Sequence, residues 1–250
     1  MNLNLLASAA NAYYGRGYGY GGYYFDWTYL LVIAGLLLSM IASARVKGTF
    51  AQYSRMRSMS GMTGAMAAQR VLQSAGIYDV RIERVSGELT DHYDPRSKVL
   101  RLSDSTYGSN SVAAVCVAAH ECGHAIQHQK SYGPLVLRST LVPLANFGSS
   151  LSWPVFLMGL VLSIRPLVTV GIVLFSLAVL FQLVTLPVEF NASTRALRVL
   201  ESTHILGDTE LAAGKRVLNA AAMTYVASLA ASILQLLRLI ILAGGRKRDD

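Results

Sequence analysis

The chain carries the stretch VAAVCVAAHECGHAIQH at residues 112–128, which contains an H-E-x-x-H motif from His120 to His124. The residues before the motif are all small or apolar, as in a buried helix. Residues four apart lie on one helix face, so His120 and His124 can offer two imidazoles to one metal ion. Glu121 lies next to them and can take the proton of a metal-bound water. The motif therefore predicts a catalytic zinc site with Glu121 as its base.

The alternative interpretation of the motif is an ordinary helix with two surface histidines, which would have the same sequence pattern. A buried histidine pair and glutamate without a metal would need other partners to offset their desolvation. We expect Gly123 to leave space for the metal to approach. Cys116 and Cys122 are the two cysteines of the chain. They point in different directions on this helix, so we expect reduced thiols and packing roles rather than a disulfide or metal ligation.

The composition indicates a membrane protein, because 53% of the residues are hydrophobic and only 14% are charged. Together with the apolar runs, the composition predicts a mainly α fold with three or four transmembrane helices, and the H-E-x-x-H motif predicts a small α+β zincin-like metallopeptidase domain beside them. Residues 27–44 form the first predicted span, and residues 139–188 form a membrane hairpin that turns at Arg165-Pro166. Residues 223–244 are long enough for a further crossing, although they contain Gln235 and Arg238.

Basic residues near the first span predict its orientation. Arg16 stands alone before it, and four basic residues follow it: Arg45, Lys47, Arg55 and Arg57. The positive-inside rule then places residues 45–138, the metallopeptidase part, in the cytoplasm beneath a plasma membrane that the chain crosses several times. The net charge of +8 suits an anionic lipid leaflet, and the absence of a basic-aromatic module argues against nucleic acid as a partner.

Two further regions have distinct patterns. Residues 1–26 form a Gly/Tyr-rich tail of low complexity. Residues 61–75 suit an amphipathic helix closed by Gly76, and residues 80–85 and 98–103 alternate like strands around a reversal at Asp94-Pro95. They predict a small β-hairpin or short sheet ahead of the metal helix. Its edge strand can hold an extended peptide over the metal, or the hairpin can be purely structural.

A catalytic zinc ion usually has a third protein ligand. His128 is the nearest histidine, but it lies about 12 Å of helix rise from His120, too far to share one ion on a straight helix. Glu189 emerges from the apolar run QLVTLPVEF, where a carboxylate is costly unless it has a partner such as a metal. The alternative is a helix-end carboxylate paired with Arg195. Glu189 begins the predicted segment 189–222, which contains the third-ligand helix and the helix after it.

Four motifs together resemble the YugP-like membrane-bound neutral zinc metallopeptidases: LTDHYDPRSKVLRLS, VAAHECGHAIQH, LVPLANFGS and LPVEFNAS. The resemblance spans residues 25–238. It implies a gluzincin-type site in which one zinc ion is held by His120, His124 and Glu189, with Glu121 as general base. The motif order is also similar to the HtpX-type and CAAX prenyl proteases, which carry an aspartate where this chain has Ser193.

These observations predict a membrane-anchored zinc endopeptidase that cleaves membrane or membrane-proximal polypeptides. The alternatives are a zinc-dependent hydrolase of lipidated substrates and a noncatalytic zinc-bearing quality-control scaffold, against which the intact Glu121 argues. The candidate residues around the ligands fall into two groups. Those for substrate binding or oxyanion stabilisation are Thr90, His92, Tyr93 and Tyr225, and those supporting the ligands are Asn191, Ser193 and Arg195. The partners we expect are a polypeptide substrate and the lipid bilayer, and no oligomeric state is predicted.

Overall fold

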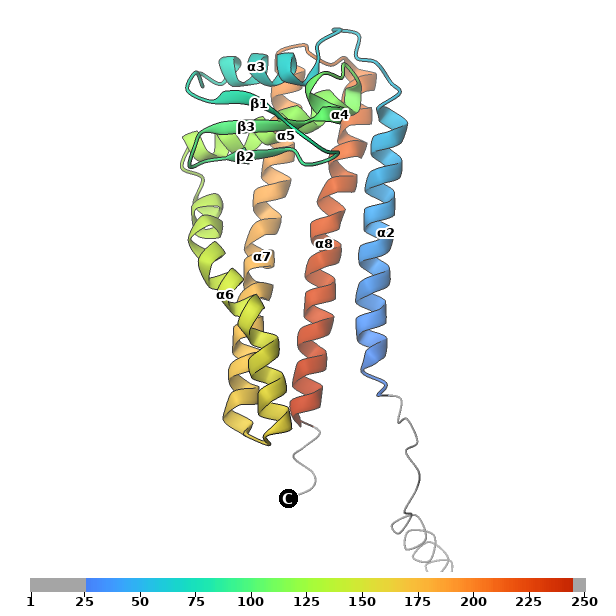
Figure 1. The fold of residues 1–250 in the computed structure, drawn as a ribbon. Helices are drawn as coiled ribbons and strands as arrows, with labels where there is room; N and C mark the ends of the chain where they lie inside the picture. Colours follow the sequence, from blue (N-terminus) through green and yellow to red (C-terminus); the bar gives the residue numbers. More distant parts are fainter. Residues whose placement is uncertain (1–25, 245–250) are drawn as a thin grey trace, which may run out of the picture.

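The computed structural model describes residues 26–244 and consists of four long helices with a smaller α+β part at one end (Figure 1). The long helices are α2 (Tyr29–Tyr53), α6 (Gly133–Val161), α7 (Arg165–Ser202) and α8 (Asp208–Gly244). All four are long and apolar enough to cross a membrane. The prediction of a mainly α protein with three or four spans is therefore confirmed. The tail of residues 1–25 and the basic cluster at residues 246–248 lie outside the described residues.

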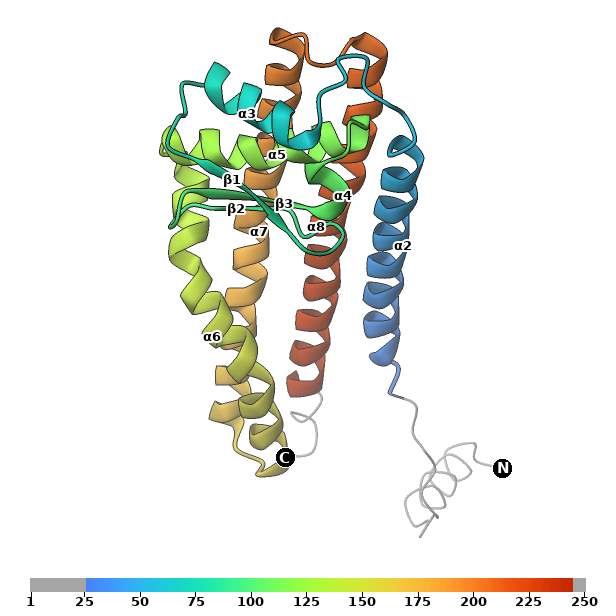
Figure 2. The same cartoon turned by 45° about the horizontal axis from the view of Figure 1, so that its top comes forward.

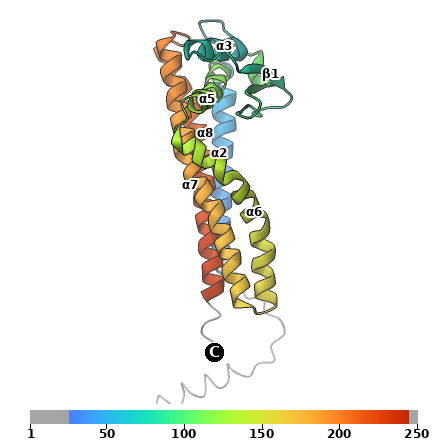
Figure 3. The same ribbon diagram turned by 90° about the vertical axis from the view of Figure 1, so that its left-hand side faces the viewer.

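The long helices lie in a row, with α6 against α7, α7 against α8 and α8 against α2 (Figures 1 and 3). Glycines let neighbours approach closely: a Cβ added at Gly171 of α7 would lie 2.7 Å from the Cβ of Phe156 in α6. Large apolar side chains such as Leu30, Ile33 and Leu37 of α2 remain exposed. An exposed apolar surface of this extent is what lipid would cover.

The helices continue past the predicted ends of the membrane segments. α2 extends to Tyr53 rather than ending at residue 44, and α7 passes through Pro187 without a break. The second arm of the membrane hairpin and the segment bearing Glu189 are therefore one helix. Likewise, residues 208–222 and 223–244 both belong to α8. The reason is tertiary packing, because α5 lies against α7 and α8 beyond their most apolar parts and stabilises their extensions.

The smaller part contains α3 (Gly64–Ser74), α4 (Asp104–Tyr107), α5 (Val112–Gln129) and a three-stranded sheet. The strands are β1 (Arg81–Val85), β2 (His92–Asp94) and β3 (Val99–Ser103), in the order β1-β3-β2. β1 pairs with β3 in parallel, so the two strands predicted from the sequence do not form a hairpin with each other. The hairpin partner of β3 is the short strand β2, which is antiparallel to it and lies at an edge of the sheet.

Local polar contacts explain this arrangement. The predicted reversal joins β2 to β3, and the carboxylate of Asp94 accepts hydrogen bonds from the Arg96 amide and the Ser97 hydroxyl. Before β2, the carboxylate of Asp91 accepts hydrogen bonds from the backbone amide and the hydroxyl of Ser103. These contacts bring residues 91–94 beside β3, and β1 takes the other side of that strand. Alternation in the sequence identified the strands but not their partners.

Helix α5 lies across α7 and α8 in the part of the molecule that holds the sheet (Figure 2). Its first turn is capped by the Ser111 hydroxyl, which accepts a hydrogen bond from the Ala114 amide. A Cβ added at Gly123 would lie 2.5 Å from the backbone oxygen of Ala192 in α7. The expectation that Gly123 leaves space for a metal is therefore wrong, because this space is filled by the α7 backbone. Cys116 and Cys122 are both buried and free, as expected.

Candidate metal site

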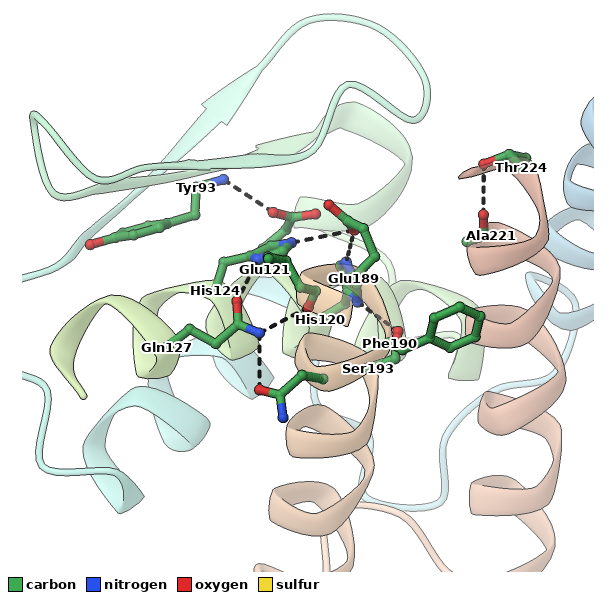
Figure 4. Close-up of polar contacts among 12 residues, drawn as sticks. Tyr93, His120, Glu121, His124, Gln127, Glu189, Phe190, Ser193, Ala221 and Thr224 are labelled. Atoms are coloured by element: carbon green, nitrogen blue, oxygen red, sulfur yellow. Dashed lines mark hydrogen bonds and ion pairs between the residues drawn. The ribbon is translucent and has the colours of Figure 1, made fainter. Parts of the chain in front are cut away.

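Two helices bring three possible metal ligands together. His120 and His124 come from α5, and Glu189 comes from α7. The Nε2 atoms of the two histidines lie 3.3 Å and 3.6 Å from Oε2 of Glu189. Figure 4 shows the Glu189 carboxylate directed at both imidazole rings. Tetrahedral bonds of about 2.1 Å would separate neighbouring ligand atoms by roughly 3.4 Å, so the three side chains are spaced to hold one metal ion.

The surroundings of the Glu189 carboxylate also suit a bound metal ion. Its side chain is only 2% exposed, and within the described chain its Oε2 atom has no hydrogen-bond partner. Burial lowers the pKa of His124, but the nearby carboxylates of Glu189 and Glu121 raise it more, so the net pKa lies above its ordinary value. The site therefore favours a positive charge. Two imidazoles and a carboxylate are ligands that zinc prefers.

Each histidine is oriented through its other ring nitrogen. Nδ1 of His120 lies 3.0 Å from the Ser193 hydroxyl, and Nδ1 of His124 lies 3.1 Å from Oε1 of Gln127. The Gln127 amide nitrogen donates to the carbonyl of Val188 and to Oδ1 of Asn191, so Oε1 remains to accept a proton from His124. Nε2 of His124 is then left with a free lone pair facing the ligand cluster, and the Ser193 hydroxyl can accept a proton from Nδ1 of His120 in the same way.

The residues predicted to support the ligands lie at different distances from them. Ser193 contacts His120 directly because it follows Glu189 by four residues on the same face of α7. Asn191 contacts Gln127 instead of a ligand. Arg195 is farther out, where its Nε donates to Asn191 and its guanidinium lies 5.6 Å from the Tyr132 ring centre.

Sequence reasoning missed two residues of this site. Gln127 is fully buried, and its position three residues after His124 on a buried helix was the available signal. Arg138 of α6 is the second, with Nη1 lying 3.4 Å from Oε1 of Glu189. The alternative that pairs Glu189 with Arg195 is therefore wrong, because the cation that faces this carboxylate is Arg138.

The proposed base lies under the edge strand of the sheet. Oε2 of Glu121 accepts a hydrogen bond of 3.1 Å from the Tyr93 backbone amide (Figure 4). A cavity of about 290 Å³ separates the strand from the ligands, and its walls include residues 91–93, Arg138 and Tyr225. The ring of His128 is directed at Tyr93, whose hydroxyl lies 2.9 Å from its Nδ1. His128 therefore supports the strand and does not join the ligands.

The four candidates for substrate contact differ in their surroundings. Burial raises the pKa of the Tyr93 hydroxyl to about 12, with smaller effects from nearby carboxylates. The Thr90 hydroxyl donates to the carbonyl of Ser86, and the exposed His92 ring contacts the carbonyl of Thr90. Tyr225 of α8 lines the cavity next to the ligands. It also lines a second cavity of about 190 Å³, which continues past Glu121 to Val46 of α2.

Comparison with known proteins agrees with this geometry. Residues 28–244 match the model of a protein family described as "Putative neutral zinc metallopeptidase". The chain is also 49% identical over 212 residues to the "Putative membrane protease YugP" of Bacillus subtilis (strain 168), which covers 85% of this chain and 94% of the relative. The chain belongs to this zinc metallopeptidase family. No solved structure gives a significant match.

Membership in the zinc metallopeptidase family identifies the metal as zinc and implies a hydrolase. The cluster of His120, His124 and Glu189 is a site that can hold one such ion. The Bacillus subtilis relative is described as a membrane protease, and four helices of this chain are long and apolar enough to cross a membrane.

Proposed function

We propose that the protein is a membrane-anchored zinc endopeptidase of the gluzincin type, which hydrolyses peptide bonds of membrane or membrane-proximal proteins. The observation that carries this proposal is the position of Glu121. Its carboxylate lies between the zinc-ligand cluster and the edge strand β2, beside a cavity that can receive a substrate. A purely structural zinc site has no need of such a carboxylate.

The chain supplies the proton transfers of the reaction. When bound, zinc supplies a Lewis acid that polarises the scissile carbonyl and makes water a stronger nucleophile. Glu121 accepts a proton from the attacking water as the new carbon–oxygen bond forms. It then returns that proton to the amine nitrogen as the carbon–nitrogen bond breaks. The hydrogen bond from the Tyr93 amide holds the Glu121 carboxylate in place for both transfers.

The edge strand supports an extended polypeptide as the substrate. The Tyr93 amide points at Glu121, so this edge of β2 faces the cavity while its other edge pairs with β3. The Tyr93 amide is occupied by Glu121, and the Tyr93 carbonyl on the same edge remains to accept a hydrogen bond from a substrate strand by β-augmentation. The side chain of Tyr93 is held by His128, which keeps the strand at a fixed position relative to the metal helix.

The location of the cleft supports membrane-proximal substrates. Its walls include Leu135 and Val142 near the start of the apolar helix α6 and Tyr225 of α8. Arg45 and Lys47 follow the most apolar part of α2 at the same end of the molecule, so we place the site on the cytoplasmic side of the plasma membrane. The aliphatic walls of the second cavity also favour a lipidated substrate as an alternative. Its volume of about 190 Å³, however, suits a side chain better than a long acyl chain.

Replacement of the base tests the proposal. The Glu121→Gln protein should bind zinc as tightly as the wild type, because all three ligands remain. Its cleavage of casein or of a detergent-solubilised membrane protein should fall by about 10²–10⁴-fold, the usual contribution of a general base. Glu201→Gln, at an exposed position of α7, is the matched control and should cleave normally.

Three outcomes separate the hypotheses. Wild-type activity in the Glu121→Gln protein would show that the base is assigned wrongly. A wild-type protein that binds zinc but cleaves only lipidated peptides would favour the alternative substrate class. A zinc-bound protein that cleaves neither would be a scaffold.

A further inference from the structure

We propose that Arg138 is a positioning residue that holds the Glu189 carboxylate so that a single oxygen, Oε2, binds the zinc. The inference deepens the proposed function, because it assigns how the third ligand is held. Arg138 belongs to α6, whereas the three ligands belong to α5 and α7. The arginine therefore links the first arm of the membrane hairpin to the metal site.

The two oxygens of Glu189 have different partners. Oε2 faces Nε2 of His120 and of His124, and it accepts no hydrogen bond from the described residues. Oε1 faces Nη1 of Arg138 at 3.4 Å. A carboxylate that binds a metal through both oxygens fills two coordination positions, and one that binds through a single oxygen fills one. An arginine that occupies Oε1 favours the second mode and leaves more of the metal for water and substrate.

The charges around the site explain why a cation is needed beside the Glu189 carboxylate. The groups that orient the two histidines are the Ser193 hydroxyl and the Gln127 amide, and both are neutral. Glu189 is a buried carboxylate, which would carry a large desolvation cost without a positive partner. Arg195 does not supply that charge, because its guanidinium is held by Asn191 and Tyr132. Arg138 does, and its 29% exposed side chain lines the substrate cavity together with Glu189.

Arginine also suits the task better than lysine. Its guanidinium is a rigid, planar group with several donors, so it can face one carboxylate oxygen while its other nitrogens remain solvated. A lysine would keep the charge but would move its single ammonium group more freely. The two residues should therefore differ in how well they fix the ligand, and this difference gives the test a graded response.

The test measures metal binding rather than activity. The full-length protein in detergent micelles is stripped of metal, and its zinc dissociation constant is measured by competition with a fluorescent chelator. Arg138→Gln should weaken zinc binding by about 10–100-fold, as expected for a residue that orients a metal ligand. The zinc dissociation constant of Arg138→Lys should lie between those of the wild type and Arg138→Gln. Arg198→Gln, at an exposed position of α7, removes the same charge and should bind zinc like the wild type.

Two further measurements identify the mechanism. Cobalt substituted for zinc should show weaker visible absorption bands in Arg138→Gln than in the wild type, because a freed second oxygen raises the coordination number. In a Glu189→Gln background, Arg138→Gln should weaken metal binding much less than it does alone, because the two residues act as one unit.

Unchanged zinc affinity and cobalt spectrum in Arg138→Gln would overturn the inference. That would hold even if peptide cleavage fell, since the arginine would then act on the substrate. A wild-type protein that binds no zinc would instead contradict the metal site itself, so the two failures are distinguishable.

Discussion

Two buried charges lie far apart along the long helices, and the groups that contact them differ. Glu189 lies beside α5 and leaves its Oε2 atom without a hydrogen-bond partner among the described residues. Arg238 lies near the other end of α8, and its side chain is 10% exposed. It contacts the start of α2, with Nη2 3.7 Å from Asp26 and Nε donating to the Thr28 hydroxyl at 3.2 Å. Its guanidinium also lies 4.2 Å from the Tyr29 ring centre.

The difference separates a structural charge from a functional one. Arg238 meets a carboxylate, a hydroxyl and an aromatic face, so the protein itself supplies its partners. Glu189 has a cation on one oxygen only, and its other oxygen needs a partner that residues 26–244 do not provide. Glu210 of α8 is a useful third case, because it is equally buried and its two oxygens accept hydrogen bonds from the backbone amides of Met59 and Gly207. A buried charge therefore indicates function where its set of partners is incomplete.

The largest expected effect comes from Glu189→Gln, which should abolish peptide cleavage and tight zinc binding. Zinc at 100 times its dissociation constant stabilises the protein that binds it by about 2.7 kcal/mol. The variant should lose this rise in unfolding temperature, while its metal-free unfolding temperature should not fall, because a buried charge without full partners has been removed. Thermal unfolding with and without zinc measures both effects.

Glu210→Gln is the matched control for that experiment. It should lower the unfolding temperature in both conditions, because two backbone amides lose a charged acceptor, and the rise on adding zinc should persist. If Glu189→Gln kept the zinc-dependent rise, Glu189 would not be a ligand and the comparison would fail.

A smaller effect is expected at Tyr225, whose side chain lines both cavities beside Glu121 and Glu189. If its hydroxyl stabilises the oxyanion, Tyr225→Phe should lower kcat by roughly 10²-fold, with little change in KM or in zinc affinity. His92→Ala should change kcat by much less, because the exposed His92 ring contacts the carbonyl of Thr90. Steady-state kinetics on one peptide substrate compares the two variants. Equal losses of kcat in the two variants would show that the Tyr225 hydroxyl does not stabilise the oxyanion.

Much of this architecture could be predicted from the sequence because the decisive signals are local. Apolar runs of sufficient length indicated the membrane helices, and the i, i+4 spacing placed His120 and His124 on one face of α5. Glu189 was identifiable because a carboxylate in an apolar run needs a partner. Ser193 followed from its position one turn after Glu189. In each case the relevant neighbours lie within a few residues along the chain.

What could not be predicted depends on contacts between distant segments. The parallel pairing of β1 with β3 and the role of Gly123 are set by tertiary packing. Arg138 reaches Glu189 only because α6 returns alongside α7. In the sequence, Arg238 is only a charge within an apolar segment, and its partner Thr28 is 210 residues away. Periodicity cannot identify such a partner.

The smallest effect on activity is expected at Arg238, and a substitution there tests whether this buried charge is structural where Glu189 is functional. Arg238→Leu removes a desolvated cation from an aromatic face, an interaction of about 2 kcal/mol. In a chain of this size that loss corresponds to a fall of about 4–8 °C in unfolding temperature. The fall should be the same with and without zinc, because Arg238 lies about 20 Å of helix rise beyond Tyr225, the α8 residue beside the ligands. The kcat/KM of the folded protein should stay within about two-fold of the wild type, since a change far from the site rarely couples to it.

Arg238→Lys keeps the charge but loses the planar stacking on Tyr29, so its unfolding temperature should lie between those of the wild type and Arg238→Leu. If Arg238→Leu instead lost zinc affinity or activity while its unfolding temperature was unchanged, the two ends of the helices would be coupled, and the division between a structural and a functional charge would not hold.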